Sequence, residues 1–310
     1  MFLFNKRRTY PIGIDLGEDT LRMVQFADNS KGISLIAGGS ENRPVDIVPG
    51  SSTWQRWAIE AIKNVTSNGR FSGKNVTAAI PASEMFVDNI KMPKVGDEKP
   101  EEAIFSKIKQ KLTFDFTLAM IKYIPTEEDN IIVIATEREK IDRHLAIYER
   151  ANLQIESIGI WPVALANSYA RFFGRRKMDL QAVVMLIDIK SNSTNVVISR
   201  YKNPLFARSI PVGARQLGIN EMISRLVMEL VACKKHFGQM YRNIEIERLI
   251  FLSGRVVEKE TYTALAKQLE MPAQMGDCLT AVEAANIYEL GIDRRSSQCS
   301  WAIAFGLALP

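Results

Sequence analysis

The 310-residue chain is 46% hydrophobic and 24% charged, a composition that excludes a disordered polypeptide and suffices for two lobes with a buried core. Its net charge of +5 comes from 40 basic and 35 acidic residues without a repeated basic face, so we predict no nucleic-acid partner. No apolar run approaches the roughly 18–20 residues of a membrane-spanning helix, and we expect a cytoplasmic protein.

The sequence starts with "MFLFNKRR", in which basic residues follow a very short apolar stretch. This order is the reverse of that in a secretory signal, which agrees with a cytoplasmic location. Apolar residues beside three cations could also rest on an anionic membrane surface, so peripheral contact with the inner membrane is one interpretation. Disorder at the chain end is the alternative.

Cysteine and histidine give no sign of a disulfide framework or a metal site. Cys233, Cys278 and Cys299 lack a Cys-x-x-Cys spacing, so we expect buried free thiols. His144 and His236 lie far apart, each without a second ligand type at metal spacing. We therefore predict neither a histidine metal site nor a catalytic triad.

The first part of the chain predicts a sheet covered by a helix. Apolar runs at residues 11–16, 21–27 and 32–40 predict three strands, the first two around a polar turn. Residues 53–65 predict an amphipathic helix that packs on this sheet. Its apolar stripe consists of Trp54, Trp57, Ala58, Ala61, Ile62 and Val65. The segment 75–81 predicts a further strand.

Residues 83–158 follow a different pattern, which predicts a small strand-and-helix unit inserted into the first lobe. The segments in order are a strand at 85–93, a helix at 99–112 with Pro100 near its start, a hairpin at 121–136 and a helix at 138–152.

The second part of the chain repeats the pattern of the first. Residues 182–212 predict three strands separated by "KSNS" and "KNP". The first two strands, "IDIKSNSTNVV" around Asp188, align with "IDLGEDTLRMV" around Asp15, and two such units indicate two similar lobes. Helices are predicted at 215–227 and 229–242, followed by a strand, a Ser-Gly turn and a helix from residue 248.

These motifs together resemble the actin-like ATPase superfamily, and most closely the PilM family of type IV pilus assembly proteins, with FtsA as a more distant relative. Further similar features are "LFNKRR", "KMP", "IIVIAT", "GIWPVALANS" and "FGLAL". The resemblance implies an α/β, actin-like (ribonuclease H-like) fold of two lobes. We expect a first lobe at 1–180 with the inserted subdomain at about 83–158, and a shortened second lobe at 181–310.

The resemblance also implies a site for ATP and Mg²⁺ at the hairpin turns. In the family these turns hold phosphates through backbone N–H groups, and strand-end aspartates, here Asp15 and Asp188, orient Mg²⁺ through its waters. The implied cofactor-binding residues are Asp15, Gly17, Thr20, Arg22, Asp188, Ser191, Thr194, Ser253 and Gly254. No residue can be named that would orient an attacking water. For either aspartate the alternative role is to cap its own turn.

Three positions depart from the family pattern. Lys190 stands where glycine is expected, Arg255 stands where adenosine would pack against bare backbone, and Arg22 stands where lysine is common. Lys190 either blocks the phosphate cradle or supplies a point charge to it. A weak nucleotide binder and a scaffold that has lost its nucleotide are both consistent with this pattern, and any hydrolysis should be very slow.

The function that the resemblance implies is that of a scaffold beneath the inner membrane in a type IV pilus or related secretion machine. The expected partner is the N-terminal cytoplasmic tail of a PilN-like bitopic membrane protein, which the scaffold would link to motor or platform proteins. We expect this tail to bind as an extended peptide in a groove between the inserted subdomain and the first lobe.

Two other classes of function stay open at this level. An ATP-dependent phosphotransferase of the same fold would need a substrate pocket, a catalytic carboxylate and an intact adenosine motif, which Lys190 and Arg255 disfavour. A nucleic-acid binder is suggested only by the sequence pI of about 9.0, and its affinity would fall steeply with salt.

Overall fold

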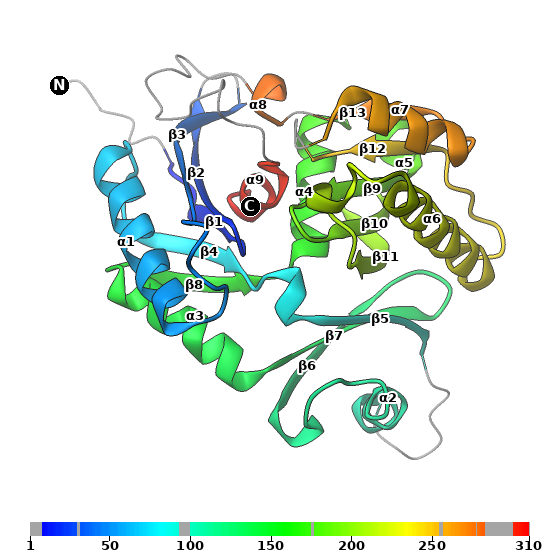
Figure 1. The fold of residues 1–310 in the computed structure, drawn as a ribbon, viewed down its shortest axis with the longest axis horizontal. Coiled ribbons are helices and arrows are strands. Elements are labelled where there is room, and N and C mark those ends of the chain that lie inside the picture. The colour runs from blue at the N-terminus through cyan, green and yellow to red at the C-terminus, as the bar shows by residue number, and fades with distance from the viewer. Residues whose placement is uncertain are drawn as a thin grey trace.

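The computed structural model describes residues 8–29, 32–92, 100–174, 177–253, 257–276, 278–282 and 300–309. Three sheets organise these residues, two of five strands and one of three. Figure 1 shows helices on both sides of the two larger sheets and the small sheet extending from them at one end of the molecule. This arrangement is the mixed α/β architecture that the sequence predicts.

The first sheet has the order β3-β2-β1-β4-β8. Its strands are β1 (Ile12–Leu16), β2 (Thr20–Asn29), β3 (Gly32–Asn42), β4 (Asn75–Ala79) and β8 (Gln154–Gly159). Helices α1 (Ser52–Asn68) and α3 (Arg138–Arg150) cover its outer face. The predicted stripe of α1, from Trp54 to Val65, is buried against this sheet and α3. Because β1 pairs with β2 and β4, the turn that follows Asp15 leaves the middle of the sheet.

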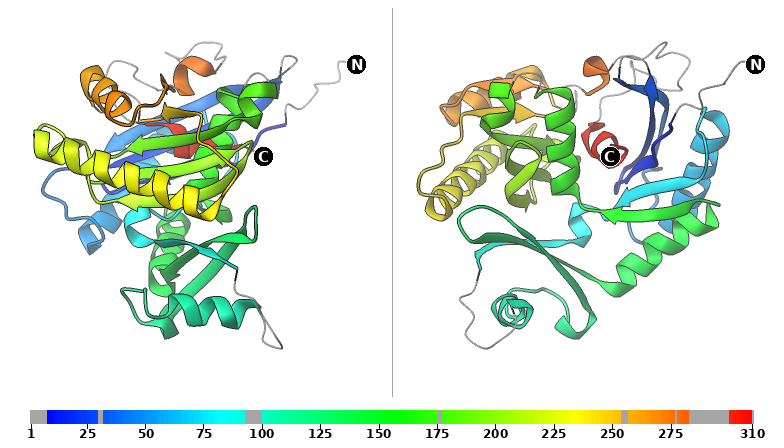
Figure 2. Two further views of the ribbon diagram at one scale, coloured as in Figure 1. Left: turned by 90° about the vertical axis from the view of Figure 1, so that its right-hand side faces the viewer. Right: turned by 180° about the vertical axis from the view of Figure 1, so that it is seen from behind.

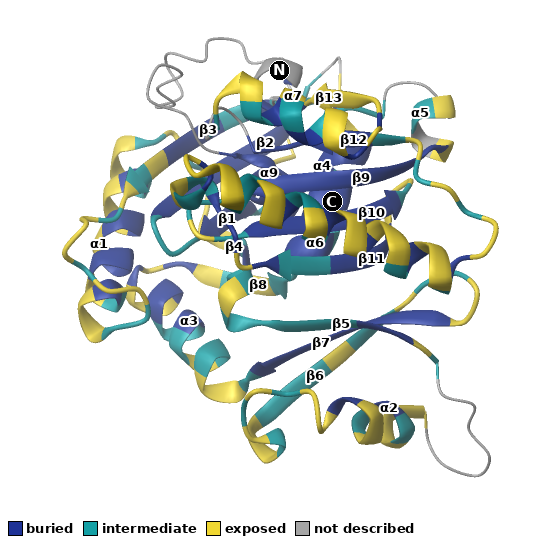
Figure 3. Ribbon diagram, turned by 45° about the vertical axis from the view of Figure 1, so that its right-hand side comes forward, coloured by how far each residue is buried: buried dark blue, intermediate teal, exposed yellow. Residues whose placement is uncertain are grey.

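The second sheet has the order β11-β10-β9-β12-β13. Its strands are β9 (Val183–Ile189), β10 (Thr194–Arg200), β11 (Asn203–Ile210), β12 (Arg248–Phe251) and β13 (Ala273–Met275). Its hairpin, β9-β10, repeats the antiparallel hairpin β1-β2. The outer helices are α6 (Asn220–Met240) and α7 (Lys259–Gln268), and Figure 3 shows the outward side of α6 as exposed.

The prediction of two helices at 215–227 and 229–242 is wrong, because one helix, α6, spans most of both segments. Its buried residues are Leu226, Leu230, Cys233 and Phe237. Their spacing of three or four residues continues one apolar stripe across the predicted break, and no proline interrupts it.

The small sheet has the order β5-β7-β6 and is antiparallel throughout. Its elements are β5 (Phe86–Lys91), β6 (Ala119–Pro125) and β7 (Asn130–Glu137), with the helix α2 (Pro100–Ile108) on one face. The predicted hairpin at 121–136 is therefore confirmed. The chain leaves the first sheet after β4 and returns to it with β8, while the domain boundaries at 83, 158 and 180 stay predictions.

Two helices occupy the space between the large sheets, as the view from behind shows (Figure 2). α9 (Ala302–Leu307) contacts β1, β2 and β4, while α4 (Trp161–Phe172) contacts β9, β10 and β11. Gly306 allows α9 to approach α4, because a Cβ at this position would overlap the carbonyl oxygen of Ala164. One buried cluster, which includes Phe26, Trp161 and Leu186, therefore joins both sheets.

The remaining elements are short. They are the 3-10 helices η1 (Ala82–Glu84), η2 (Phe116–Leu118) and η3 (Ala214–Gln216) and the helices α5 (Lys177–Gln181) and α8 (Cys278–Ala281). In the part of the chain that the structure describes, no helix is long and apolar enough to cross a membrane. Cys233 is a buried free thiol, as predicted, and Cys278 is also buried, where its Sγ lies 3.3 Å from Ser168 Oγ. Cys299 lies outside the described residues.

Candidate functional site

The hairpin turns of the two large sheets face each other across a cavity of about 240 Å³. The turn after β1 supplies Gly17, Glu18 and Asp19, and the turn after β9 supplies residues 190–193. Residues 79–83 and the central helices α4 and α9 line the rest of the cavity. The structure therefore brings together the turns that follow Asp15 and Asp188, which the internal repeat of the sequence predicts to be equivalent.

Lys190 joins the two strand-end aspartates. Its Nζ lies 3.2 Å from Asp15 Oδ2 and 3.3 Å from Asp188 Oδ2. Arg22 also faces Asp15, with Nη1 3.3 Å from Oδ2. Burial by itself would lower the pKa of the Lys190 ammonium, but the charges of Asp15 and Asp188 outweigh this effect and raise the pKa. Lys190 is therefore held as a cation between the two sheets.

Asp188 depends on Lys190 for charge compensation. Its side chain is fully buried, and neither of its oxygens accepts a hydrogen bond from a described residue. The ion pair with Lys190 at 3.3 Å is its compensating interaction within the described part of the chain. An ionised carboxylate in such a place needs a nearby positive charge, and the ammonium supplies it.

The implied Mg²⁺ does not fit this arrangement. Mg²⁺ is held in proteins by carboxylate oxygens and by several water molecules. Between Asp15 and Asp188, however, an ammonium already contacts one oxygen of each carboxylate. A divalent cation at the same place would be repelled by this charge and would have to displace the side chain.

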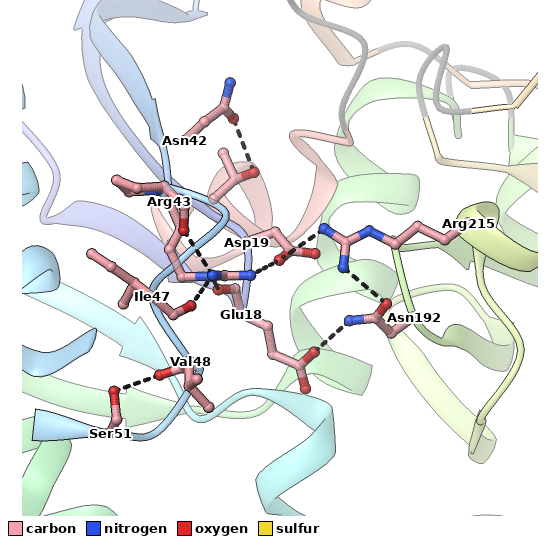
Figure 4. Close-up of polar contacts among 11 residues, drawn as sticks. Glu18, Asp19, Asn42, Arg43, Ile47, Val48, Ser51, Asn192 and Arg215 are labelled. Carbon is pink, nitrogen blue, oxygen red and sulfur yellow. Dashed lines mark hydrogen bonds and ion pairs between the residues drawn. The ribbon is translucent and has the colours of Figure 1, made fainter. Parts of the chain in front are cut away.

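A second group of polar residues joins the same two turns (Figure 4). Asp19 Oδ1 lies 2.6 Å from Nη2 of Arg43 and 3.3 Å from Nη2 of Arg215. Asn192 Nδ2 donates to Glu18 Oε2 over 3.0 Å, and Arg215 Nη1 donates to Asn192 Oδ1 over 3.4 Å. These contacts link the turn of the first sheet with the turn of the second sheet.

Asp19 is ionised within this group. Burial tends to raise the pKa of its carboxyl, but the hydrogen bonds of Arg43 and Ser191 and the charges of Arg215 and Arg43 lower the pKa overall. Glu18 and Asp19 thus place carboxylates in the turn where the family resemblance implies phosphates. The negative charges of these carboxylates would repel a polyphosphate bound in the same turn.

Three further predicted residues line the cavity. Gly17 N donates to the Thr20 carbonyl over 3.1 Å, and Thr20 Oγ1 donates to Asn42 Oδ1 over 3.2 Å. Gly17 has no left-handed backbone angle, and a Cβ there would meet only the Thr20 carbonyl oxygen, at 3.3 Å. Ser191 lies in the opposite wall and hydrogen-bonds to Asp19.

Thr194 and Ser253 do not line this cavity. Thr194 Oγ1 donates to the Val212 carbonyl over 2.7 Å, and the residue is fully buried. Ser253 Oγ accepts from Ile189 N over 2.7 Å and so fastens the end of β12 to β9. Their hydroxyl groups thus stabilise the second sheet. Gly254, and Arg255 beside it, lie outside the described residues.

The residues that the sequence reasoning missed are Glu18, Asp19, Arg43, Asn192 and Arg215. Glu18 and Asp19 could have been noticed in the sequence, because two adjacent acidic residues disfavour phosphate binding in the turn that contains them. Arg43 and Arg215 come from segments without any motif, and only the folded chain brings them to Asp19.

A second cavity, of about 470 Å³, lies where the small sheet meets the second sheet. It is lined by residues 83–89, Thr113, Phe114, Lys140, Phe206, Arg208, Ser209 and His236. β5 and β11 are edge strands of their sheets. The Asn89 side chain joins them, donating to the Ala207 carbonyl over 2.8 Å and accepting from Ala207 N over 2.9 Å.

Comparison with known proteins identifies the family. The family model of the type IV pilus assembly protein PilM matches residues 13–249. The chain belongs to the PilM family. A search of curated proteins finds no match. This PilM family member is similar in structure to a chain of a PilM-PilN type IV pilus biogenesis complex, with a TM-score of 0.75 and 19% identity over 96% of this chain and 97% of that chain.

Comparison with solved structures also finds two further, weaker matches. The ethanolamine utilization protein EutJ from Carboxydothermus hydrogenoformans has a TM-score of 0.52 and 11% identity over 96% of this chain and 89% of that chain. A Bacteroides thetaiotaomicron VPI-5482 protein with an actin-like ATPase fold has a TM-score of 0.49 and 12% identity, with coverages of 91% and 98%. The predicted actin-like α/β fold of this PilM family member is confirmed.

Proposed function

We propose that the chain is a scaffold on the cytoplasmic side of the inner-membrane platform of a type IV pilus, where it binds the N-terminal tail of a PilN-like bitopic protein. The observation that carries this proposal is the family match over residues 13–249, together with similarity over 96% of the chain to a component of a PilM-PilN complex. The scaffold links the tail to motor or platform proteins, and this partner keeps it beside the membrane.

The cavity between β5 and β11 is the site that we propose for the tail. It differs from the groove expected from the resemblance, because its second wall comes from the second sheet and not from the first lobe. Lys140 Nζ lies 5.7 Å from the centre of the Phe114 ring, and Phe206 lies in the opposite wall. These aromatic groups suit the apolar side chains of an extended peptide.

Charged groups around this cavity already have partners. Arg208 Nη2 lies 2.7 Å from Glu229 Oε2, and Lys111 Nζ lies 2.6 Å from Asp88 Oδ2. These ion pairs lie at the edge of the cavity, so they should contribute little to the affinity for the tail. Their charges can still favour one register of the bound peptide over others. Affinity for the tail should therefore come mainly from the aromatic wall.

The proposal is tested by calorimetric titration of the protein with a synthetic peptide of the PilN-like tail from the same organism. Phe114→Ala should weaken binding by about tenfold or more, as expected when an aromatic anchor of an interface is truncated. Phe116→Ala is the matched control, because Phe116 packs on Phe105, with ring centres 5.9 Å apart, and does not line the cavity.

The two possible failures of this experiment are distinct. Equal affinity of Phe114→Ala and the unaltered protein would reject the cavity as the binding site. Absence of binding by the unaltered protein would reject the tail as the partner. A deletion of 83–158 is a weaker test, because it removes α3 and most of β8, which belong to the first sheet and its core.

The described residues disfavour the alternative function of an ATP-dependent phosphotransferase. Such an enzyme needs positioned positive charge on the transferred phosphoryl group. Here Glu18 and Asp19 bring negative charge into the turn, and the ammonium of Lys190 pairs with Asp15 and Asp188.

A further inference from the structure

Lys190 connects two strands that belong to different sheets. Asp15 lies in β1 of the first sheet and Asp188 lies in β9 of the second, and 175 residues separate Asp15 from Lys190 in the chain. Lys190 itself immediately follows β9, so its side chain reaches across the cavity from the second sheet to the first. A single ammonium thus bridges the two carboxylates at which the family resemblance implies a divalent cation.

The surroundings make this bridge important for stability. The side chains of Asp15 and Asp188 are 11% and 0% exposed, and that of Lys190 is 23% exposed. Arg22 compensates Asp15 from the first sheet. Among the described residues, however, Lys190 is the one cation within ion-pair distance of Asp188. Removal of the lysine charge would therefore leave Asp188 buried and uncompensated.

We propose that the Lys190 ammonium takes the place of the divalent cation and holds the two sheets together, so that Mg²⁺ and nucleotide are not needed to close the cavity. This inference goes beyond the proposed scaffold function and does not depend on it. A scaffold with a built-in cation keeps one arrangement of its lobes whatever the nucleotide concentration.

The contacts around Glu18 and Asp19 support the same conclusion. Asn192 and Arg215 of the second lobe reach Glu18 and Asp19 of the first, as Figure 4 shows. These contacts join the same two turns that Lys190 joins. In a turn that binds a nucleotide, such side chains would instead be available to contact the ligand. Both sets of contacts between the two turns form without an added ion.

The test begins with the unaltered protein. Calorimetric titration with MgCl₂, and with ATP plus MgCl₂, should give no saturable binding, and neither addition should change the melting temperature. Lys190→Met keeps most of the side-chain volume but removes the charge. This variant should melt roughly 5 °C or more below the unaltered protein, and it should acquire saturable Mg²⁺ binding that restores part of the loss.

Two further variants control for other causes. Lys111→Met removes another lysine ion pair, with Asp88 at 2.6 Å, and should not acquire Mg²⁺ binding. Lys190→Met combined with Asp188→Asn removes the uncompensated carboxylate, so it should melt above Lys190→Met and bind no Mg²⁺. If Lys190→Met does not fold, recovery of folding in this double variant is the expected result.

Several results would overturn the proposal. Mg²⁺-dependent ATP binding by the unaltered protein would mean that the lysine does not replace the cation. A Lys190→Met variant that melts like the unaltered protein, or that folds but stays indifferent to Mg²⁺, would mean that the ammonium does not have this role. A double variant no more stable than Lys190→Met would likewise contradict it.

Discussion

Glu84 stabilises the connection between the first sheet and the small sheet through a charged contact with α3. Its Oε2 lies 2.7 Å from Arg143 Nη2 and 3.1 Å from His144 Nε2. Burial tends to raise the pKa of this carboxyl, but the hydrogen bond of His144 and the charge of Arg143 outweigh burial and lower the pKa below its usual value of 4.5. The carboxylate is therefore the form that the folded protein prefers.

This preference gives a prediction for acid stability. Because the pKa is lowered on folding, the contribution of Glu84 is fully present above about pH 4.5 and is lost as the pH falls through the folded-state pKa. Glu84→Gln should lower the free energy of unfolding by roughly 1–3 kcal/mol near neutral pH and by much less near pH 3. Urea denaturation over this pH range measures the difference.

An exposed carboxylate supplies the control for this prediction. Glu60 pairs with Lys63 at 3.0 Å, but its side chain is 65% exposed, so Glu60→Gln should change stability little at any pH. A loss of stability in Glu84→Gln that stays constant from neutral to acidic pH would show that packing, and not ionisation, is responsible.

Single residues also mark the limit of sequence reasoning about the site. The sequence shows that Lys190 replaces the expected glycine. The internal repeat of the chain also correctly predicts that Asp15 and Asp188 lie in equivalent turns. The ion-pair partners of Asp19 could not be predicted from the sequence. Arg43 and Arg215 reach Asp19 from 24 and 196 positions away in the chain. Thr194 and Ser253 have the residue types of a phosphate site, yet their hydroxyl groups satisfy backbone groups.

At the scale of elements, the packing of α9 on α4 depends on a residue without a side chain. A Cβ at Gly306 would overlap backbone atoms of Ala164, and the buried helices have no room to separate. Gly306→Ala should therefore lower the free energy of unfolding by about 1–3 kcal/mol, as overpacking of a core does. Gly238→Ala, in the exposed part of α6, should instead stabilise the protein by up to about 1 kcal/mol.

The two variants carry the same glycine-to-alanine substitution, so a difference in their stability reflects the surroundings of each glycine. Apart from the backbone of its own helix, nothing lies within 4 Å of a Cβ added at Gly238. The helix propensity of alanine therefore decides the effect of this substitution. Thermal and urea denaturation of both variants measure the two signs. A stabilised Gly306→Ala variant would mean that α4 and α9 are not packed as closely as described.

The elements themselves follow from local patterns to a large extent. Alternating and continuous apolar runs predict most strands of the three sheets, although not β8 or β13, which were missed. The stripe from Trp54 to Val65 predicts α1. The main error concerns α6, where a local pattern suggested a break but one stripe of buried residues continues. Sheet order could not come from such patterns, because the pairing of β4 with β8 joins segments about 80 residues apart.

For the molecule as a whole, three sheets share one core. The buried cluster between the large sheets includes Val24 of β2, Val197 of β10 and Ile134 of β7. Polar contacts add to it, such as the one between Thr126 Oγ1 and the Tyr241 hydroxyl at 2.7 Å. The lobes are therefore held at their base by packing and at the cavity by the charges of Lys190, Asp19 and Arg215.

This arrangement predicts that nucleotide does not change the shape of the protein. Lobes that close around a ligand move as hinged bodies and become more compact. Here the two sheets are already joined without a ligand. Small-angle X-ray scattering should therefore give the same radius of gyration with and without ATP and Mg²⁺. Lys190→Met combined with Arg215→Ala should increase the radius of gyration in the absence of ATP, because it removes both charged links across the cavity.

Lys111→Met again serves as the control, since its ion pair with Asp88 lies away from this cavity. Its scattering curve should superimpose on that of the unaltered protein. Compaction of the unaltered protein on addition of ATP and Mg²⁺ would contradict the prediction, because it would require a cavity that is open before the ligand arrives. An unchanged radius in the double variant would assign the closed arrangement to the shared core, with the charges contributing local order alone.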